Sequence, residues 1–317
     1  MTTTQLAPTA ERSGEDEPSV TVRGLGKRYG ARTVLDGLDL EVRRGECFAL
    51  LGPNGAGKTT TIEILEGSRA RTAGEVSVLG VDPAKPTRAW RNRIGLVLQE
   101  CEMEPLYTVR ETVGLYAGFY EKPRGVDETI ALVGLADKAD ARLGTLSGGQ
   151  KRRVDVAIAL IGDPDLVFLD EPTTGFDPAA RREFWNVIEG LAGLGVTIFL
   201  TTHYMDEAQH LAARVAILRA GRIVAQGRPE ELGSGETVVR FRAPAGVAPD
   251  AIAAAAEAQV SSSGNEVSFT SPDPQRALAR LLAWAEREGV ALDGLDVHRP
   301  SLEDVFLELT RDLDADV

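Results

Sequence analysis

The sequence has few cysteines and no long apolar run. Cys47 and Cys101 are the only cysteines in 317 residues, too few for a disulfide framework, so a reducing compartment is favoured. A membrane-spanning helix needs about 20 consecutive apolar residues. The most apolar region, residues 154–169, is interrupted by three aspartates and a proline. We therefore expect no part of the chain to cross a membrane, and any work at a membrane needs another subunit.

Basic residues are also in deficit. The chain has 48 Asp and Glu against 35 Lys and Arg, a formal net charge of −13, which makes nucleic acid a poor partner. We predict that the basic cluster Lys151–Arg153 is a solvated helix face. Residues 1–18 are rich in Thr, Ala and Glu and lack the apolar core of a signal peptide, so we expect a disordered tail on a cytosolic protein.

The pattern of what is present predicts an α/β fold. Short apolar runs that suit buried parallel strands alternate with helical stretches. These runs are residues 46–51, 94–98, 166–169 and 196–200. Residues 215–225 suit a hairpin around Gly221. We expect this nucleotide-binding domain to cover residues 19–235.

Two other regions differ in composition from this α/β pattern. Residues 101–165 favour helices over 108–120, 128–135 and 147–161, a helical subdomain inserted in the core. Beyond Gly233–Gly235, residues 237–317 predict a small α+β accessory domain. Its expected strands are 237–241, 266–270 and 291–297, and its expected helices begin at Pro249 and span 274–288 and 301–311. The last helix has one apolar face, formed by Leu302, Val305, Phe306 and Leu309.

The strongest motif follows the first buried strand and matches G-x-x-x-x-G-K-[ST]. It consists of Gly52, Pro53, Asn54, Gly55, Ala56, Gly57, Lys58 and Thr59, followed by Thr60. Glycines let backbone N–H groups point at phosphate oxygens, and a following helix N-terminus favours negative charge. Lys58 adds a full charge for the β and γ phosphates, and the Thr59 hydroxyl can ligate Mg²⁺. A chance match in a glycine-rich turn is the alternative, and the strand–loop–helix context favours ATP with Mg²⁺.

A second motif ends the strand at residues 166–169. Asp170 is expected beside the phosphate loop, where open α/β sheets bind ligands, and can hold Mg²⁺. Glu171 is placed to polarise an attacking water as a general base. An apolar strand that simply enters an acidic loop is the alternative.

The third motif is Leu146-Ser147-Gly148-Gly149-Gln150, before a helix whose apolar face is Val154, Ala157, Ile158 and Ile161. Ser147 and Gln150 have capping-box spacing, so a well-capped helix is one interpretation. A helix start with two glycines also exposes N–H groups to an anion. LSGGQ between a phosphate loop and an Asp-Glu strand resembles the ABC-ATPase signature, and the chain is identified as resembling the ATP-binding subunits of ABC transporters.

The resemblance assigns roles to four further residues. It implies that Tyr29 stacks on adenine, that Gln99 contacts Mg²⁺ or water and senses the membrane subunit, that Asp177 is the D-loop aspartate, and that His203 contacts the γ-phosphate. Taken alone, Tyr29 could be a surface turn residue and His203 a polar loop residue. The family usually has Leu where this chain has Phe176, which affects packing across a dimer.

The same resemblance implies a mechanism and partners. Two copies pair head to tail, and ATP lies between the phosphate loop of one and Ser147–Gly149 of the other. Lys58, Mg²⁺ and His203 stabilise charge while Glu171 orients water. The segment Ser301–Phe306 resembles the drug-resistance subgroup of ABC-2 type exporters. It implies an ABC-2 type permease as partner, a place on the cytoplasmic face of the membrane, and export of a substrate such as a drug or antibiotic.

The alternative is a soluble, non-transport ABC ATPase. A ribosome-acting protein of this kind has two cassettes in one chain, whereas only one phosphate loop is present. A DNA-repair ATPase has a long coiled coil between the two halves of its site, and none is seen here. A degenerate, binding-only cassette lacks Glu171 or His203, and this sequence has both.

Overall fold

The computed structural model describes residues 17–98, 103–232, 236–243, 246–298, 302 and 304–306. Contacts divide the chain into two compact units, Met1–Val224 and Ala225–Val317. The strands are β1 (Val20–Tyr29), β2 (Arg32–Val42), β3 (Cys47–Leu51), β4 (Ala73–Val78), β5 (Ile94–Val97), β6 (Leu166–Asp170), β7 (Thr197–Thr202), β8 (Arg214–Arg219), β9 (Arg222–Gly227), β10 (Thr237–Arg242), β11 (Val260–Ser263), β12 (Glu266–Ser271) and β13 (Asp296–His298). The helices are α1 (Lys58–Leu65), α2 (Arg88–Arg91), α3 (Val109–Ala117), α4 (Val126–Leu132), α5 (Gly148–Leu160), α6 (Pro178–Gly193), α7 (Met205–Leu211), α8 (Pro229–Leu232), α9 (Pro249–Ala256) and α10 (Pro274–Glu288), with 3₁₀ turns at Ala136–Lys138 and Leu143–Thr145.

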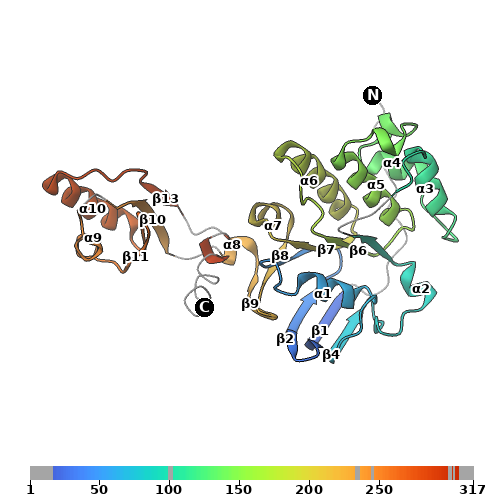
Figure 1. The fold of residues 1–317 in the computed structure, drawn as a ribbon, viewed down its shortest axis with the longest axis horizontal. Coiled ribbons are helices and arrows are strands. Elements are labelled where there is room, and N and C mark those ends of the chain that lie inside the picture. The colour runs from blue at the N-terminus through green and yellow to red at the C-terminus, as the bar shows by residue number, and fades with distance from the viewer. Residues whose placement is uncertain are drawn as a thin grey trace. The chain divides into compact units, whose positions relative to one another are not determined.

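A six-stranded sheet, ordered β5-β6-β7-β3-β8-β9, forms the centre of the first unit (Figure 1). The pairs β5–β6, β6–β7, β7–β3 and β3–β8 are all parallel. Phe48, Phe168 and Phe199 are buried in neighbouring strands, with ring centroids 5.6 and 5.7 Å apart. Because these strands are parallel, the carboxyl ends of β3, β6 and β7 meet at one edge, where the predicted motifs begin.

A second, antiparallel sheet, ordered β2-β1-β4, was not predicted from the sequence. In β2 the buried side chains alternate at Leu38, Leu40 and Val42, the pattern of a half-buried strand. Helix α1 contacts strands of both sheets, and one apolar core joins them.

The predicted helical subdomain is present as α3, α4 and α5, which pack against one another (Figure 1, green). Thr108 and Glu111 form a capping box at the start of α3, and Ser147 and Gln150 form another at α5. Of the apolar face expected on α5, Val154, Ala157 and Ile161 are buried, whereas Ile158 is half-buried. No described helix combines the length and apolarity that a membrane span requires.

The second unit contains a four-stranded antiparallel sheet, ordered β11-β12-β10-β13, with a core of its own. Val239, Phe241 and Phe269 from the strands pack with Leu281 and Trp284 of α10. The prediction of a strand over residues 291–297 is wrong for most of its length, since Gly294 takes φ of 68° and the strand begins at Asp296.

The end of the second unit was predicted as a helix over residues 301–311. Residues 302 and 304–306 are helical, and Leu302 and Phe306 are buried. Ser301 and Leu309 lie outside the described residues. The α/β core with a helical subdomain and a small α+β unit confirms the predicted fold class, whereas the predicted domain boundary near residue 235 stays a prediction.

Candidate functional site

The loop between β3 and α1 places the first motif at the carboxyl edge of the parallel sheet. Gly57, the N-cap of α1, has φ of 111°, and a Cβ there would lie 2.7 Å from Leu35 Cδ2. A Cβ at Gly52 would lie 2.5 Å from the carbonyl oxygen of Leu218. Both positions therefore require glycine, because a side chain would displace the loop from the neighbouring strands.

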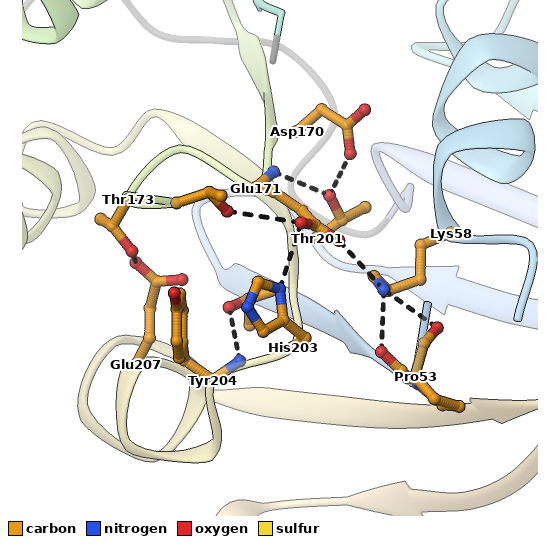
Figure 2. A network of polar contacts seen from close by, with 12 residues as sticks. Pro53, Lys58, Asp170, Glu171, Thr173, Thr201, His203, Tyr204 and Glu207 are labelled. Atoms are coloured by element: carbon orange, nitrogen blue, oxygen red, sulfur yellow. Dashed lines mark hydrogen bonds and ion pairs between the residues drawn. The ribbon is translucent and has the colours of Figure 1, made fainter. Parts of the chain in front are cut away.

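The side chain of Lys58 points back across this loop (Figure 2). Only 4% of Lys58 is exposed, and its ammonium group donates to the carbonyls of Gly52 at 2.8 Å and Pro53 at 3.2 Å. Its third partner is Glu171, whose Oε1 is 3.0 Å from Nζ. The fold thus brings together the phosphate loop and the carboxylate after β6, which are far apart in the sequence.

Glu171 adopts a left-handed backbone conformation, with φ of 43°, which is uncommon for a residue with a side chain. Its N–H donates to the carbonyl and hydroxyl oxygens of Thr201, each at 3.1 Å. Its Oε2 lies 3.1 Å from Nδ1 of His203, on the side of the carboxylate away from Lys58 (Figure 2). Burial raises the pKa of Glu171, but Lys58 and then His203 outweigh burial and hold the pKa below its usual value.

Asp170 precedes Glu171 and is buried at the end of β6. Its Oδ1 accepts a hydrogen bond from the Thr201 hydroxyl, and burial raises its pKa, opposed by that bond and by one with Thr59. Thr201 therefore forms hydrogen bonds with both acidic residues, a role that its place directly after the strand predicted at residues 196–200 did not reveal. Among the described residues, no cluster of three or more His, Cys, Asp or Glu side chains is arranged to hold a metal ion.

Lys58, Glu171 and His203 border a pocket of about 810 Å³. Its lining consists of Tyr29, Arg32, Val34, Asn54, Gly55, Gly57, Lys58, Thr59, Thr60, Arg69, Glu171, Thr174 and His203. Tyr29, 42% exposed, has Lys27 Nζ at 4.8 Å and Arg69 Cζ at 5.5 Å from its ring centroid. Arg32 and Arg69 were not predicted, because no local motif marks them, and they add positive charge to a pocket suited to a polyphosphate.

The predicted residues of the segment 147–150 and Asp177 do not line this pocket in the single chain. Ser147 and Gly148 are exposed at the start of α5, where Gln150 N donates to Ser147 Oγ at 3.3 Å and Ser147 N donates to Gln150 Oε1 at 3.0 Å. Asp177 caps α6 by accepting from the N–H groups of Ala179 and Ala180. Gln99 lies outside the described residues.

Phe176, where the resemblance leads one to expect Leu, packs within the chain. Its ring meets Phe184 of α6 edge-on, with centroids 5.9 Å apart. A Cβ added to Gly149 would lie 3.8 Å from the same ring. The larger side chain thus fills space between the start of α5 and α6.

The prediction that the whole basic cluster at residues 151–153 is solvated is wrong for Arg152, which is only 7% exposed. Its Nε donates to the Pro172 carbonyl at 3.0 Å, its Nη2 to the Asp170 carbonyl at 3.1 Å, and its Nη1 to the Leu98 carbonyl. Sequence reasoning missed this residue because all three acceptors come from distant parts of the chain.

Comparison with known sequences points to one family. Residues 35–174 match the family described as "ABC transporter", and residues 237–301 match "ABC transporter domain-containing protein-like, C-terminal domain". The chain is 41% identical over 304 residues to the Nod factor export ATP-binding protein I of Ralstonia nicotianae, covering 92% of this chain and 94% of the relative. It is 36% identical over 306 residues to the daunorubicin resistance ATP-binding protein DrrA3 of Streptomyces coeruleorubidus, covering 93% and 97%.

Solved structures agree with this comparison. An ATP-binding cassette of an ABC transporter in its ADP conformation superposes with a TM-score of 0.61 at 25% identity, over 68% of this chain and 92% of that one. A dimeric ATP-binding cassette in a post-hydrolysis state, bound to ADP and phosphate, superposes with a TM-score of 0.58 at 25% identity, over 66% and 98%.

Proposed function

This chain belongs to the ATP-binding subunits of ABC transporters and is an ATPase, and we propose that it powers export of a substrate, such as a drug or antibiotic, through a separate membrane subunit. Family membership rests on relatives that match more than nine-tenths of the chain, with names that include export and drug resistance. One observation carries the proposed chemistry: Glu171 lies between Lys58 and His203 at the edge of the pocket.

We propose that this triad hydrolyses ATP by positioning and electrostatics. The triphosphate would lie on the N–H groups of Gly55–Lys58, with adenine on Tyr29. Lys58 would turn from Glu171 to the phosphates, whose greater negative charge competes for the ammonium group. Glu171 would then accept the proton of the attacking water, and His203 would stabilise charge on the γ-phosphate.

The residues at this site fit a Mg²⁺ ion that would bind together with the nucleotide. Thr59 supplies a hydroxyl and Asp170 a carboxyl, both hard oxygen ligands, and hydrogen bonding with Thr59 opposes the rise that burial causes in the pKa of Asp170. The sequence also predicts that Gln99 contacts this ion or a water molecule. Bound there, the ion would neutralise phosphate charge.

We propose that two copies of the chain complete each site. Ser147 and Gly148 are exposed and lie outside the pocket lining, so their expected contact with nucleotide requires a second chain. The dimeric cassette with ADP and phosphate offers a precedent for this arrangement. ATP would close a head-to-tail homodimer, and hydrolysis would loosen it.

We further propose that the helical subdomain side of the first unit receives an ABC-2 type permease. A second pocket, of about 440 Å³, is lined by residues of β5, α3 and α5, including Leu96, Tyr116 and Ile158. Large apolar side chains around α3 are more than half exposed, namely Leu106, Leu115 and Phe119. An apolar surface of this kind suits a protein partner, and the permease would hold the chain on the cytoplasmic face of the membrane. The net charge of −13 argues against nucleic acid as the partner.

Purification with the permease encoded beside this chain tests the transport proposal. We expect a stable complex whose ATPase rate rises with exported ligands, and a weaker complex for Phe119→Ser. Leu194→Ser, at an exposed leucine that follows α6, is the matched control. A chain that hydrolyses ATP but binds no permease would instead support the soluble, non-transport alternative.

A further inference from the structure

Arg152 is a buried cation whose main contacts are backbone oxygens. Its guanidinium group donates to the carbonyls of Asp170, Pro172 and Leu98. Asp155, one turn along α5, is 3.6 Å away. Burying a guanidinium is costly unless its donors are satisfied, so this position demands acceptors on several sides, and the backbone supplies them.

Two of these acceptors lie on either side of Glu171. Nη2 donates to the residue before it at 3.1 Å and Nε to the residue after it at 3.0 Å. Between them, Glu171 holds the left-handed conformation with φ of 43°. Such a conformation is unfavourable for a residue with a side chain and persists only where surrounding contacts fix it.

The Leu98 carbonyl and helix α5 connect Arg152 to two further segments of the chain. Leu98 follows β5 and precedes Gln99, and Arg152 belongs to α5, which begins at Ser147 and Gly148. We propose that Arg152 is a positioning residue that fixes the backbone around Glu171 and ties it to α5 and to the end of β5. This inference rests on the proposed role of Glu171 in hydrolysis.

The planar guanidinium group explains why lysine cannot replace arginine at this position. Three nitrogens of one rigid group reach three carbonyls from two segments, whereas the ammonium of lysine is a single point on a flexible chain. Loss of this group should leave the phosphate loop unchanged, because the carbonyls of Gly52 and Pro53 hold Lys58 there. The effect should therefore fall on turnover and not on ATP affinity.

The test compares the full-length protein with Arg152→Gln, Arg152→Lys and Arg153→Gln. Arg153 is the matched control, since it lies on the same helix but contacts Gly134 and Glu183. We expect both Arg152 variants to lower kcat about 10- to 100-fold, the range for a misplaced catalytic group. Their KM and ATP affinity by fluorescence titration should stay within about threefold, and Arg153→Gln should keep kcat within about threefold.

Other outcomes overturn the inference. An unchanged kcat in Arg152→Gln, or full activity in Arg152→Lys, would show that the hydrogen bonds of the guanidinium group are not needed to position Glu171. Loss of ATP binding in both Arg152 variants assigns Arg152 to folding and not to placing Glu171. Glu171→Gln is measured in parallel: if it hydrolyses ATP at the wild-type rate, the proposed function of Glu171 fails, whatever the Arg152 variants show.

Discussion

Glu171 lies between Lys58 and His203, and its chemistry requires the ion pair with Lys58 to break. Lys58 is the partner that ATP would draw away. Lys58 and His203 hold the pKa of Glu171 below its usual value against the opposing effect of burial, so the side chain is ionised at neutral pH. When Lys58 turns to phosphate, burial is less opposed, and we expect the pKa to rise toward that of an effective base.

Replacing Glu171 with Gln tests the base directly. The amide keeps the size of the side chain but cannot accept the proton, so kcat should fall about 100-fold or more while ATP affinity is kept. Gel filtration with ATP and Mg²⁺ should show a trapped dimer. Glu189→Gln, at a half-exposed residue of α6, is the control and should behave as wild type. A Glu171→Gln protein that stays monomeric and turns over normally contradicts the assignment.

Lys58→Ala removes the charge that faces the β and γ phosphates. It also removes the 3.0 Å ion pair with Glu171, which keeps its contacts with His203 and Thr174. We expect productive ATP binding to weaken strongly or disappear, as measured by fluorescence titration. Lys85→Ala, outside the pocket lining, serves as the control. Unchanged affinity and hydrolysis would mean that the loop is structural only.

At the scale of elements, the sequence predicted the helices and strands whose pattern lies within a few neighbouring residues. The apolar runs of β3, β6 and β7 and the capping box of α5 are complete within a few residues. The antiparallel sheet was largely missed, because β1 and β2 pair with register shifts that break a regular alternation of side chains. Elements defined by long-range pairing cannot be recognised from such short windows.

The candidate site shows the same division. The phosphate loop and the Asp-Glu pair could be predicted, because each motif carries its chemistry in adjacent residues. Arg152 and Thr201 could not, because their partners lie elsewhere in the chain: Thr201 reaches Asp170 and Glu171, and Arg152 reaches Leu98 and Pro172. A charged side chain is expected in solvent unless the fold supplies its partners.

Glu207 of α7 links elements around the catalytic edge. It is fully buried, and its Oε1 accepts from Thr173 Oγ1 at 2.8 Å and from Trp185 Nε1 at 3.2 Å. Thr173 follows Glu171 by two residues and faces Glu207 in Figure 2, and Trp185 belongs to α6. Burial raises the pKa of Glu207, opposed by its hydrogen bonds, so the folded protein holds this proton more tightly than the unfolded chain.

That raised pKa makes stability depend on pH. The contribution of Glu207 is complete below its unfolded pKa, about 4.5, and is lost as the pH rises through the higher folded pKa. Glu207→Gln keeps an acceptor for Thr173 and Trp185 but never ionises. We expect its Tm relative to wild type to increase from pH 4.5 to 8 in thermal scans, with Glu121→Gln, at an exposed residue, as the control. A constant or falling difference in Tm contradicts a proton held by Glu207.

At the scale of the whole molecule, the chain combines an ATPase unit with a second unit whose role the site does not explain. The pocket residues all lie between Tyr29 and His203. The second unit, Ala225–Val317, has its own sheet and its own apolar core, which includes Phe241, Phe269 and Trp284. Such a unit is either an inert appendage or an element that holds two cassettes together, and we propose the second role from the resemblance of the Ser301–Phe306 segment to the exporter subgroup.

Truncation after Gly235 separates these two roles. The shortened chain keeps β9, which ends at Gly227, and every residue of the pocket, so ATP binding should be retained. If the second unit tethers the dimer, light scattering should show a lower assembled fraction, and turnover per site should fall at low protein concentration. Turnover should then recover as the concentration rises, because mass action replaces the lost tether. The Glu171→Gln change in the same truncated chain is the control, since its turnover should stay low at every concentration. A truncated protein that dimerises and supports export as well as the full chain makes the unit an appendage, whereas one that loses ATP binding places residues beyond 235 in the ATPase core.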